Sequence, residues 1–92
     1  MQPLPVPPGS PTLRVLVVDD HPLFRFGLCT VLAAEPSIVV IGEAANGRDA
    51  ISAARTFEPD VVVMDLHLPD IDGIEATRHI CSLPFRGLQA FF

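Results

Sequence analysis

The stretch "DVVVMDLHLPDIDG", residues 60–73, joins an unbroken apolar run to a polar loop marked by proline and glycine. A continuous run of valines ending in methionine is typical of a parallel strand that is buried on both faces. Asp65 stands at the exit of this run, at the point where the polarity changes. The stretch therefore predicts a buried strand that delivers an acidic side chain to one edge of a sheet.

Two other apolar runs, residues 13–18 and 37–42, predict two more strands of the same kind. Residues 22–35, 46–57 and 72–83 carry apolar residues at helical spacing. The resulting order, β-α-β-α-β-α, predicts an α/β fold in which right-handed crossovers build a parallel sheet with helices on its faces.

Each predicted helix has a start signal or an apolar side. Pro22 suits the first helical position, with Asp20 or His21 as the N-cap. Asp72 and Glu75 match a capping box at the third helix. The residues expected to face the core are Phe24, Leu28, Val31 and Leu32 in the first helix, Ala50, Ala54 and Phe57 in the second, and Ala76, Ile80 and Leu83 in the third.

Three regions follow from this pattern. Residues 1–11 contain five prolines and predict a disordered, proline-rich leader. Residues 12–83 form the folded unit, and residues 84–92 are apolar without a clear period, which predicts an irregular tail.

Composition excludes several classes of partner. Eleven acidic against six basic residues give a net charge of −5, which argues against direct binding of nucleic acid. No apolar run approaches the 18 or so residues of a membrane span. Cys29 and Cys81 lie in apolar helical patterns without CxxC spacing, which favours free thiols in the cytosol. We therefore expect a cytoplasmic location and no membrane contact.

Asp19 and Asp20 end the first predicted strand, as Asp65 ends the third. Ligands of open α/β sheets bind at the carboxyl ends of the strands, so these side chains are expected to converge. Two carboxylates about 4.5 Å apart repel by roughly 3 to 4 kcal/mol at an effective dielectric constant near 20. Caps and turns would explain single aspartates but not a converging set of three, whereas a Mg²⁺ ion would offset the repulsion. His21 and His67 could bind a softer metal, but the excess of oxygen donors favours Mg²⁺ over zinc.

The segments "VLVVDDHPLFRFGL", "ANGRDAI" and "DVVVMDLHLPDIDGIEATRHI" together resemble the receiver domain of bacterial two-component response regulators. The Asp-Asp-His-Pro opening is similar to the subgroup that carries a C-terminal helix-turn-helix output domain. The resemblance covers residues 12–80 and implies a partial flavodoxin-like, doubly wound sheet with three of five strand–helix units. It also implies that the domain is truncated at its C-terminal end.

The resemblance implies a role for each acidic residue. Asp65 matches the phosphoacceptor, which takes a phosphoryl group from a sensor histidine kinase. Asp20 matches the direct Mg²⁺ ligand and Asp19 a ligand that acts through water, while the backbone carbonyl of His67 would complete the protein ligands. The chain itself would not be an enzyme, and would once have belonged to a regulator of transcription.

Several family features are missing from this sequence. The hydroxyl residue that ends the fourth strand and the lysine that ends the fifth have no counterpart, and the chain contains no lysine. Residues 61–64 are therefore expected to form an exposed apolar edge that invites self-association. The alternative is a truncated, non-signalling fragment that acts only as an interaction module or has no function. A phosphatase with an aspartyl nucleophile is disfavoured, because residues 65–69 do not match its D-x-D-x-T pattern.

Overall fold

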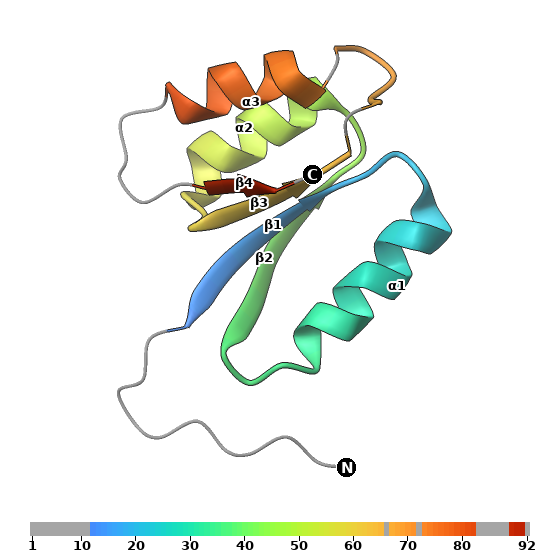
Figure 1. Ribbon diagram of the computed structural model, residues 1–92, viewed down its shortest axis with the longest axis vertical. Coiled ribbons are helices and arrows are strands. Elements are labelled where there is room, and N and C mark those ends of the chain that lie inside the picture. Colours follow the sequence, from blue (N-terminus) through green and yellow to red (C-terminus); the bar gives the residue numbers. More distant parts are fainter. Residues whose placement is uncertain (1–11, 66, 72, 83–88, 92) are drawn as a thin grey trace.

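The computed structural model describes residues 12–65, 67–71, 73–82 and 89–91. Within them four strands form one parallel sheet in the order β2-β1-β3-β4. Helix α1 lies on one face of the sheet, and α2 and α3 lie on the other (Figure 1). The elements, in chain order, are β1 (Leu13–Val18), α1 (Pro22–Ala33), β2 (Ile38–Ala44), α2 (Gly47–Phe57), β3 (Val61–Met64), α3 (Gly73–Cys81) and β4 (Gln89–Phe91).

Strand β1 is one of the two central strands of the sheet and is buried on both faces, as its continuous apolar sequence predicted. Val15 to Val18 have exposed fractions of 0 to 3%. Strand β1 pairs with β2 on one side and with β3 on the other, and Val18 lies beside both Ala44 and Met64. The ends of three strands are therefore level, and the residues that follow β1 and β3 emerge side by side.

The main core lies between the sheet and the helices α2 and α3. Small residues let these helices approach closely, and Ala50, Ala54 and Ala76 are fully buried, as predicted. Ile80 of α3 is also fully buried, as predicted. Phe57 is 42% exposed, so its predicted place in the core is wrong. The remaining buried members of this core are Leu16, Val18, Ala44, Val62 and Met64.

Helix α1 differs most from expectation. It begins at Pro22 with His21 as the N-cap, as predicted, but it contains no buried residue. Phe24 and Val31 of the predicted inward stripe are 61% and 71% exposed. The reason is that α1 packs mainly against β2 and β1, whereas α2 and α3 lie on the other face of the sheet (Figure 1).

The C-terminal region also differs from expectation. Residues 89–91, expected to be irregular, form strand β4, which pairs in parallel with β3 so that Val61 lies beside Gln89. The predicted exposed edge at β3 is therefore wrong, because its backbone groups have a partner strand on each side. The α/β, flavodoxin-like fold class is confirmed, with one strand more than predicted.

Two expectations fall on residues outside the description. The proline-rich leader, residues 1–11, lies there, as do Asp72 of the predicted capping box and Leu83. None of the described helices is both long enough and apolar enough to pass through a bilayer.

Candidate metal centre at the ends of β1 and β3

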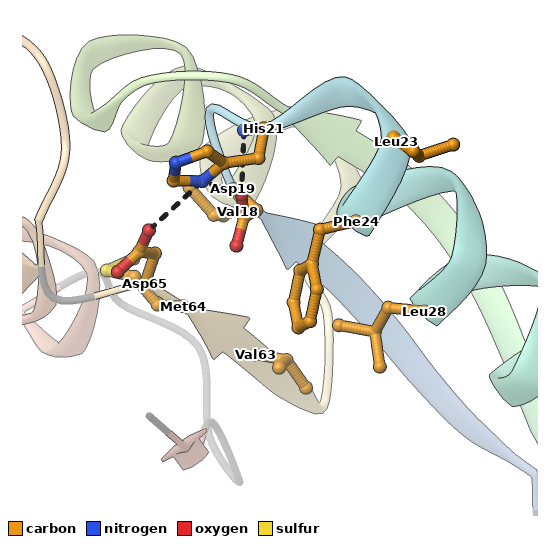
Figure 2. A pocket seen from close by; sticks show the side chains of 9 residues that line it. All are labelled: Val18, Asp19, His21, Leu23, Phe24, Leu28, Val63, Met64 and Asp65. Atoms are coloured by element: carbon orange, nitrogen blue, oxygen red, sulfur yellow. Dashed lines mark hydrogen bonds and ion pairs between the residues drawn. The ribbon is translucent and has the colours of Figure 1, made fainter.

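Three carboxylates meet at the carboxyl ends of β1 and β3, as the sequence predicted. The strand pairing continues one residue beyond each strand, because the Asp65 N–H donates to the Val18 carbonyl at 3.0 Å and the Asp19 N–H to the Ala44 carbonyl at 3.0 Å. These peptide hydrogen bonds fix the Cα positions from which the acidic side chains project. Figure 2 shows Asp19 and Asp65 entering the same space from the two neighbouring strands.

Ligand atoms of Asp19, Asp20, His21 and Asp65 all lie within 4.8 Å of one another. Asp19 is the most buried of these residues, with an exposed fraction of 7%. The side chains of Asp20 and Asp65 are partly exposed. One carboxylate of the group, Asp19, is therefore buried, while Asp20 and Asp65 reach solvent, so that a small ion or a phosphoryl donor can approach them.

His21 holds the carboxylates together. Asp19 Oδ1 accepts a hydrogen bond from the His21 backbone N–H at 2.7 Å and lies 2.9 Å from the ring atom Nδ1. The same Nδ1 is 3.1 Å from Asp20 Oδ1 and 3.8 Å from Asp65 Oδ2. The hydrogen bond with Asp19 and the negative charge of Asp20 raise the pKa of His21 above its ordinary value.

Asp20 Oδ1 is buried and has no hydrogen-bond partner among the described residues. It lies near His21 Nδ1, but that nitrogen carries at most one hydrogen, which can be donated to Asp19. A buried carboxylate oxygen without a partner is costly, and a divalent cation would satisfy it. The oxygen-rich set therefore fits Mg²⁺, which prefers carboxylate ligands and retained waters.

Arg25 supports the site from α1, a contact that the sequence analysis did not identify. Its Nη1 donates to the Asp19 carbonyl at 2.6 Å, and its Nε donates to Glu43 Oε1 at 3.1 Å. The guanidinium thus connects the helix, the end of β1 and strand β2. The available signal was an arginine in the first turn of the helix that begins at Pro22, because helical side chains tilt toward the N-terminus of their helix.

Residues 15–89 match the family model described as the response regulator receiver domain. The chain belongs to this family. Its sequence-based identification as a receiver is therefore confirmed.

Receivers of several larger proteins are similar in sequence. LiaR, a transcriptional regulatory protein of Bacillus subtilis, is 49% identical over 69 residues, which are 75% of this chain and 33% of LiaR. VraR, a response regulator of Staphylococcus aureus, is 45% identical over the same fractions of both chains. A protein-glutamate methylesterase/protein-glutamine glutaminase of Pseudomonas fluorescens is 50% identical over 75 residues, but only 20% of that enzyme is covered. The chain thus spans a third or less of the length of these relatives.

Solved receivers have the same fold. The signal receiver domain of NarL from Mycobacterium tuberculosis superimposes with a TM-score of 0.81 at 33% identity, over 88% of this chain and 64% of that one. A LuxR-family response regulator from Aurantimonas gives a TM-score of 0.72 at 48% identity, over 75% of this chain and 49% of that one. Transcriptional regulators are therefore among the receiver's relatives, as the Asp-Asp-His-Pro opening indicated.

His67 and Asp70 lie in the loop that leaves the receiver's β3. The His67 N–H donates to Asp65 Oδ1 at 3.0 Å, while the predicted ligand role of its carbonyl stays a prediction. Asp70 was not identified from the sequence, yet Oδ1 accepts from the Gly47 N–H at 2.7 Å and Oδ2 from the Arg48 N–H at 2.9 Å. Asp70 therefore connects this loop by hydrogen bonds to the start of α2. Burial raises the pKa of Asp70, but hydrogen bonds from backbone N–H groups outweigh it and lower the pKa below its ordinary value.

An open cavity of about 970 Å³ adjoins the carboxylates. Phe24 and Leu28 of α1 and Val63 of β3 form its apolar wall, and Asp19 and Asp65 stand at its acidic end (Figure 2). The acidic site is thus open on the side of the receiver where α1 leaves the sheet uncovered.

Proposed function

We propose that this receiver accepts a phosphoryl group on Asp65 with the help of Mg²⁺, within a two-component signalling system. The observation that carries the proposal is the meeting of Asp19, Asp20 and Asp65 beside an opening to solvent, with ligand atoms within 4.8 Å of one another. Membership of the receiver family supports the same reading.

The chain's own residues would position the reaction. In the transfer, the P–N bond of a kinase phosphohistidine breaks, its electron pair returns to the imidazole nitrogen, and an Asp65 carboxylate oxygen forms the new P–O bond. The His67 N–H holds Asp65 Oδ1, so the nucleophilic carboxylate has a fixed orientation. Phosphoryl transfer depends mainly on such positioning and on charge neutralisation.

Asp20 and Asp65 would hold Mg²⁺ directly, with Asp19 acting through water and the His67 carbonyl as a further ligand. Mg²⁺, when bound, would offset the charge of the carboxylates and of the phosphoryl oxygens. Asp20 Oδ1 supports this assignment, because it is a buried carboxylate oxygen that accepts no hydrogen bond from the described residues.

The partner in this proposal is a sensor histidine kinase, and the setting is the cytoplasm. LiaR is a transcriptional regulatory protein, so the receiver would act in transcription when joined to an output domain of the helix-turn-helix type. The segment itself would not bind DNA, because its net charge is −5.

Incubation with phosphoramidate and Mg²⁺, followed by intact mass measurement, tests the proposal. We expect one added phosphoryl group on the wild-type chain and none on Asp65→Asn, because the amide lacks the nucleophilic oxygen. Asp49→Asn is the matched control, since Asp49 lies on α2 outside the site and should leave labelling unchanged. Labelling of Asp65→Asn at the wild-type level would refute the assignment of the phosphoacceptor.

A second candidate is a non-signalling interaction module, which one feature of the sequence favours. The 92 residues contain no lysine, and the sequence offers no counterpart of the hydroxyl residue that ends the family's fourth strand. Such a chain could be labelled without changing its structure or association. Sedimentation and circular dichroism with and without phosphodonor would separate the candidates, because only a signalling receiver should respond. Self-association belongs to this candidate and stays a prediction.

A further inference from the structure

We infer that the start of α2 holds the loop after β3 in place, so that Asp70 and Gly47 are positioning residues for phosphoryl transfer to Asp65. Neither residue belongs to the group of ligand atoms at the ends of β1 and β3. Both act on Asp65 through the path of the loop. The inference rests on the proposed function, and it gives a role to residues 45–51, the segment "ANGRDAI".

The first contact between the loop and α2 consists of hydrogen bonds. The first backbone N–H groups of a helix have no partner inside the helix. In α2 the Gly47 N–H donates to Asp70 Oδ1 at 2.7 Å, and the Arg48 N–H donates to Asp70 Oδ2 at 2.9 Å. The following N–H group is capped locally by the Asn46 side chain. The helix start therefore depends on a carboxylate that the loop supplies.

The second contact is the close packing of the loop against Gly47. This glycine is buried at the first position of α2. A Cβ atom there would overlap Ile71 Cγ1 and would lie 2.7 Å from Ile71 Cδ1 and 3.2 Å from Asp70 Oδ1. Glycine is among the poorest helix formers, so helix formation does not explain its place. The close approach of the loop does explain it, independently of the hydrogen bonds.

The two contacts reach Asp65 because the intervening loop is short and fixed at both ends. At its start the Asp65 N–H donates to the Val18 carbonyl at 3.0 Å, and the His67 N–H donates to Asp65 Oδ1 at 3.0 Å. Release of Asp70 would free the other end of the loop and let the His67 N–H leave the carboxylate. Asp65 would then lose the fixed orientation on which the rate of transfer depends.

The opposing reading is that Asp70 and Gly47 only stabilise α2. Substitutions would then lower the stability of the domain, but the folded molecules would be phosphorylated at the wild-type rate. The His67 amide would also stay as protected from hydrogen exchange as in the wild type. Measurements under conditions where every chain is folded therefore separate the two readings.

Two substitutions disturb the contact in different ways. Asp70→Asn leaves one acceptor oxygen for two N–H groups, and Gly47→Ala adds the Cβ atom that displaces Ile71. Each variant tests the inference by itself if the other fails to fold.

Each variant has a matched control. Asp60→Asn changes a carboxylate that also accepts a backbone hydrogen bond, from the Arg14 N–H at 2.9 Å, but that lies directly before β3. Gly27→Ala places a Cβ atom on α1 where no atom lies within 4 Å. Both controls should behave like the wild type.

The measurements are the rate of labelling by phosphoramidate at saturating Mg²⁺ and, without phosphodonor, the hydrogen exchange of the His67 amide by NMR. Circular dichroism checks that each chain is folded. We expect Asp70→Asn and Gly47→Ala to lower the maximal rate by at least about fivefold. The KM for phosphoramidate should change by less than about twofold, because positioning acts after the donor binds. Exchange of the His67 amide should become at least about threefold faster.

Both changes are required of a folded variant, so a wild-type rate or wild-type exchange would overturn the inference. Equal changes in the controls would overturn it as well. Such a failure leaves labelling of wild-type Asp65 intact. Failure of the proposed function would instead leave every chain unlabelled, and exchange of the His67 amide would still show whether Asp70 and Gly47 hold the loop.

Discussion

Asp70 joins two parts of the chain that lie 23 residues apart, because its carboxylate caps α2 from the loop after β3. A carboxyl group whose pKa is lower in the folded state stabilises the fold above its unfolded pKa, near 3.8 here. That contribution is lost as the pH falls through the lower, folded pKa. The stability gained from Asp70 should therefore be complete at neutral pH and disappear in acid.

We expect Asp70→Asn to lower the urea midpoint of unfolding at pH 7. The difference from wild type should shrink as the pH falls below about 3.8, where the wild-type carboxylate also becomes neutral. Urea titrations followed by circular dichroism at several pH values provide the measurement. Glu35→Gln, at an exposed position before β2, serves as the control. If the difference in urea midpoint between wild type and Asp70→Asn persists unchanged at low pH, the charge of Asp70 does not explain the effect of the substitution.

The acidic residues of the site could be predicted because their signal is local. Each of Asp19 and Asp65 directly follows an apolar run, and parallel strands bring such ends to one edge. The position of the His21 ring could not be predicted, since a side-chain rotamer depends on its neighbours in space. Asp70 was missed for a related reason, because its partners are distant in the sequence and its Asp-Ile-Asp-Gly context suggests only a turn.

At the scale of secondary structure elements, α3 is held to the core mainly through one side. Ile80 and Ala76 are fully buried against the sheet and α2, whereas Ile74 of the same helix is 56% exposed. The two isoleucines differ in burial but not in chemistry. They therefore form a matched pair for measuring what burial contributes to stability.

We expect Ile80→Ala to lower the free energy of unfolding by about 2–5 kcal/mol, because it removes buried methyl and methylene groups and leaves a cavity. Ile74→Ala should change it by less than about 0.5 kcal/mol, as at an exposed surface position. Denaturant unfolding of both variants under the same conditions provides the comparison. Equal losses would indicate that Ile80 is not a core residue.

Elements with strong periodicity were predicted well, and those that depend on distant partners were not. Ala50 and Ala54 of α2 are buried as their spacing indicated. The stripe of α1 was also read correctly as apolar, but periodicity does not say whether another element covers it, and Phe24 is largely exposed. Strand β4 has three residues, too few to show a period, and it forms because the edge of β3 offers unpaired backbone groups.

On the scale of the whole molecule, the two faces of the sheet are unequally covered. Helices α2 and α3 lie on one face of the sheet and α1 on the other (Figure 1). The buried cluster lies on the face toward α2 and α3, and the cavity beside the carboxylates lies on the face toward α1. Leu23, Phe24 and Val31 of α1 are 83%, 61% and 71% exposed. Large exposed apolar patches are uncommon on soluble domains and bind apolar probes readily.

The dye anilinonaphthalene sulfonate should therefore bind the folded chain and increase in fluorescence. We expect Phe24→Ser to reduce this signal by at least about half, because the ring forms part of the cavity wall, and to lower the free energy of unfolding by less than about 1 kcal/mol. Leu13→Ser is the control, since Leu13 is exposed at the opposite end of β1 and does not line the cavity. Equal dye binding by Phe24→Ser and wild type would place the binding surface elsewhere.

Peptide groups, and not the carboxylates, make the hydrogen bonds that align β1, β2 and β3 at their ends. The pairing of these strands in the receiver therefore does not depend on the acidic side chains of the site. Repulsion among the three neighbouring carboxylates lowers the stability of the folded domain when no cation offsets their charge. A cation that binds the carboxylates would stabilise the folded state of the whole domain, so the melting temperature would increase with cation concentration.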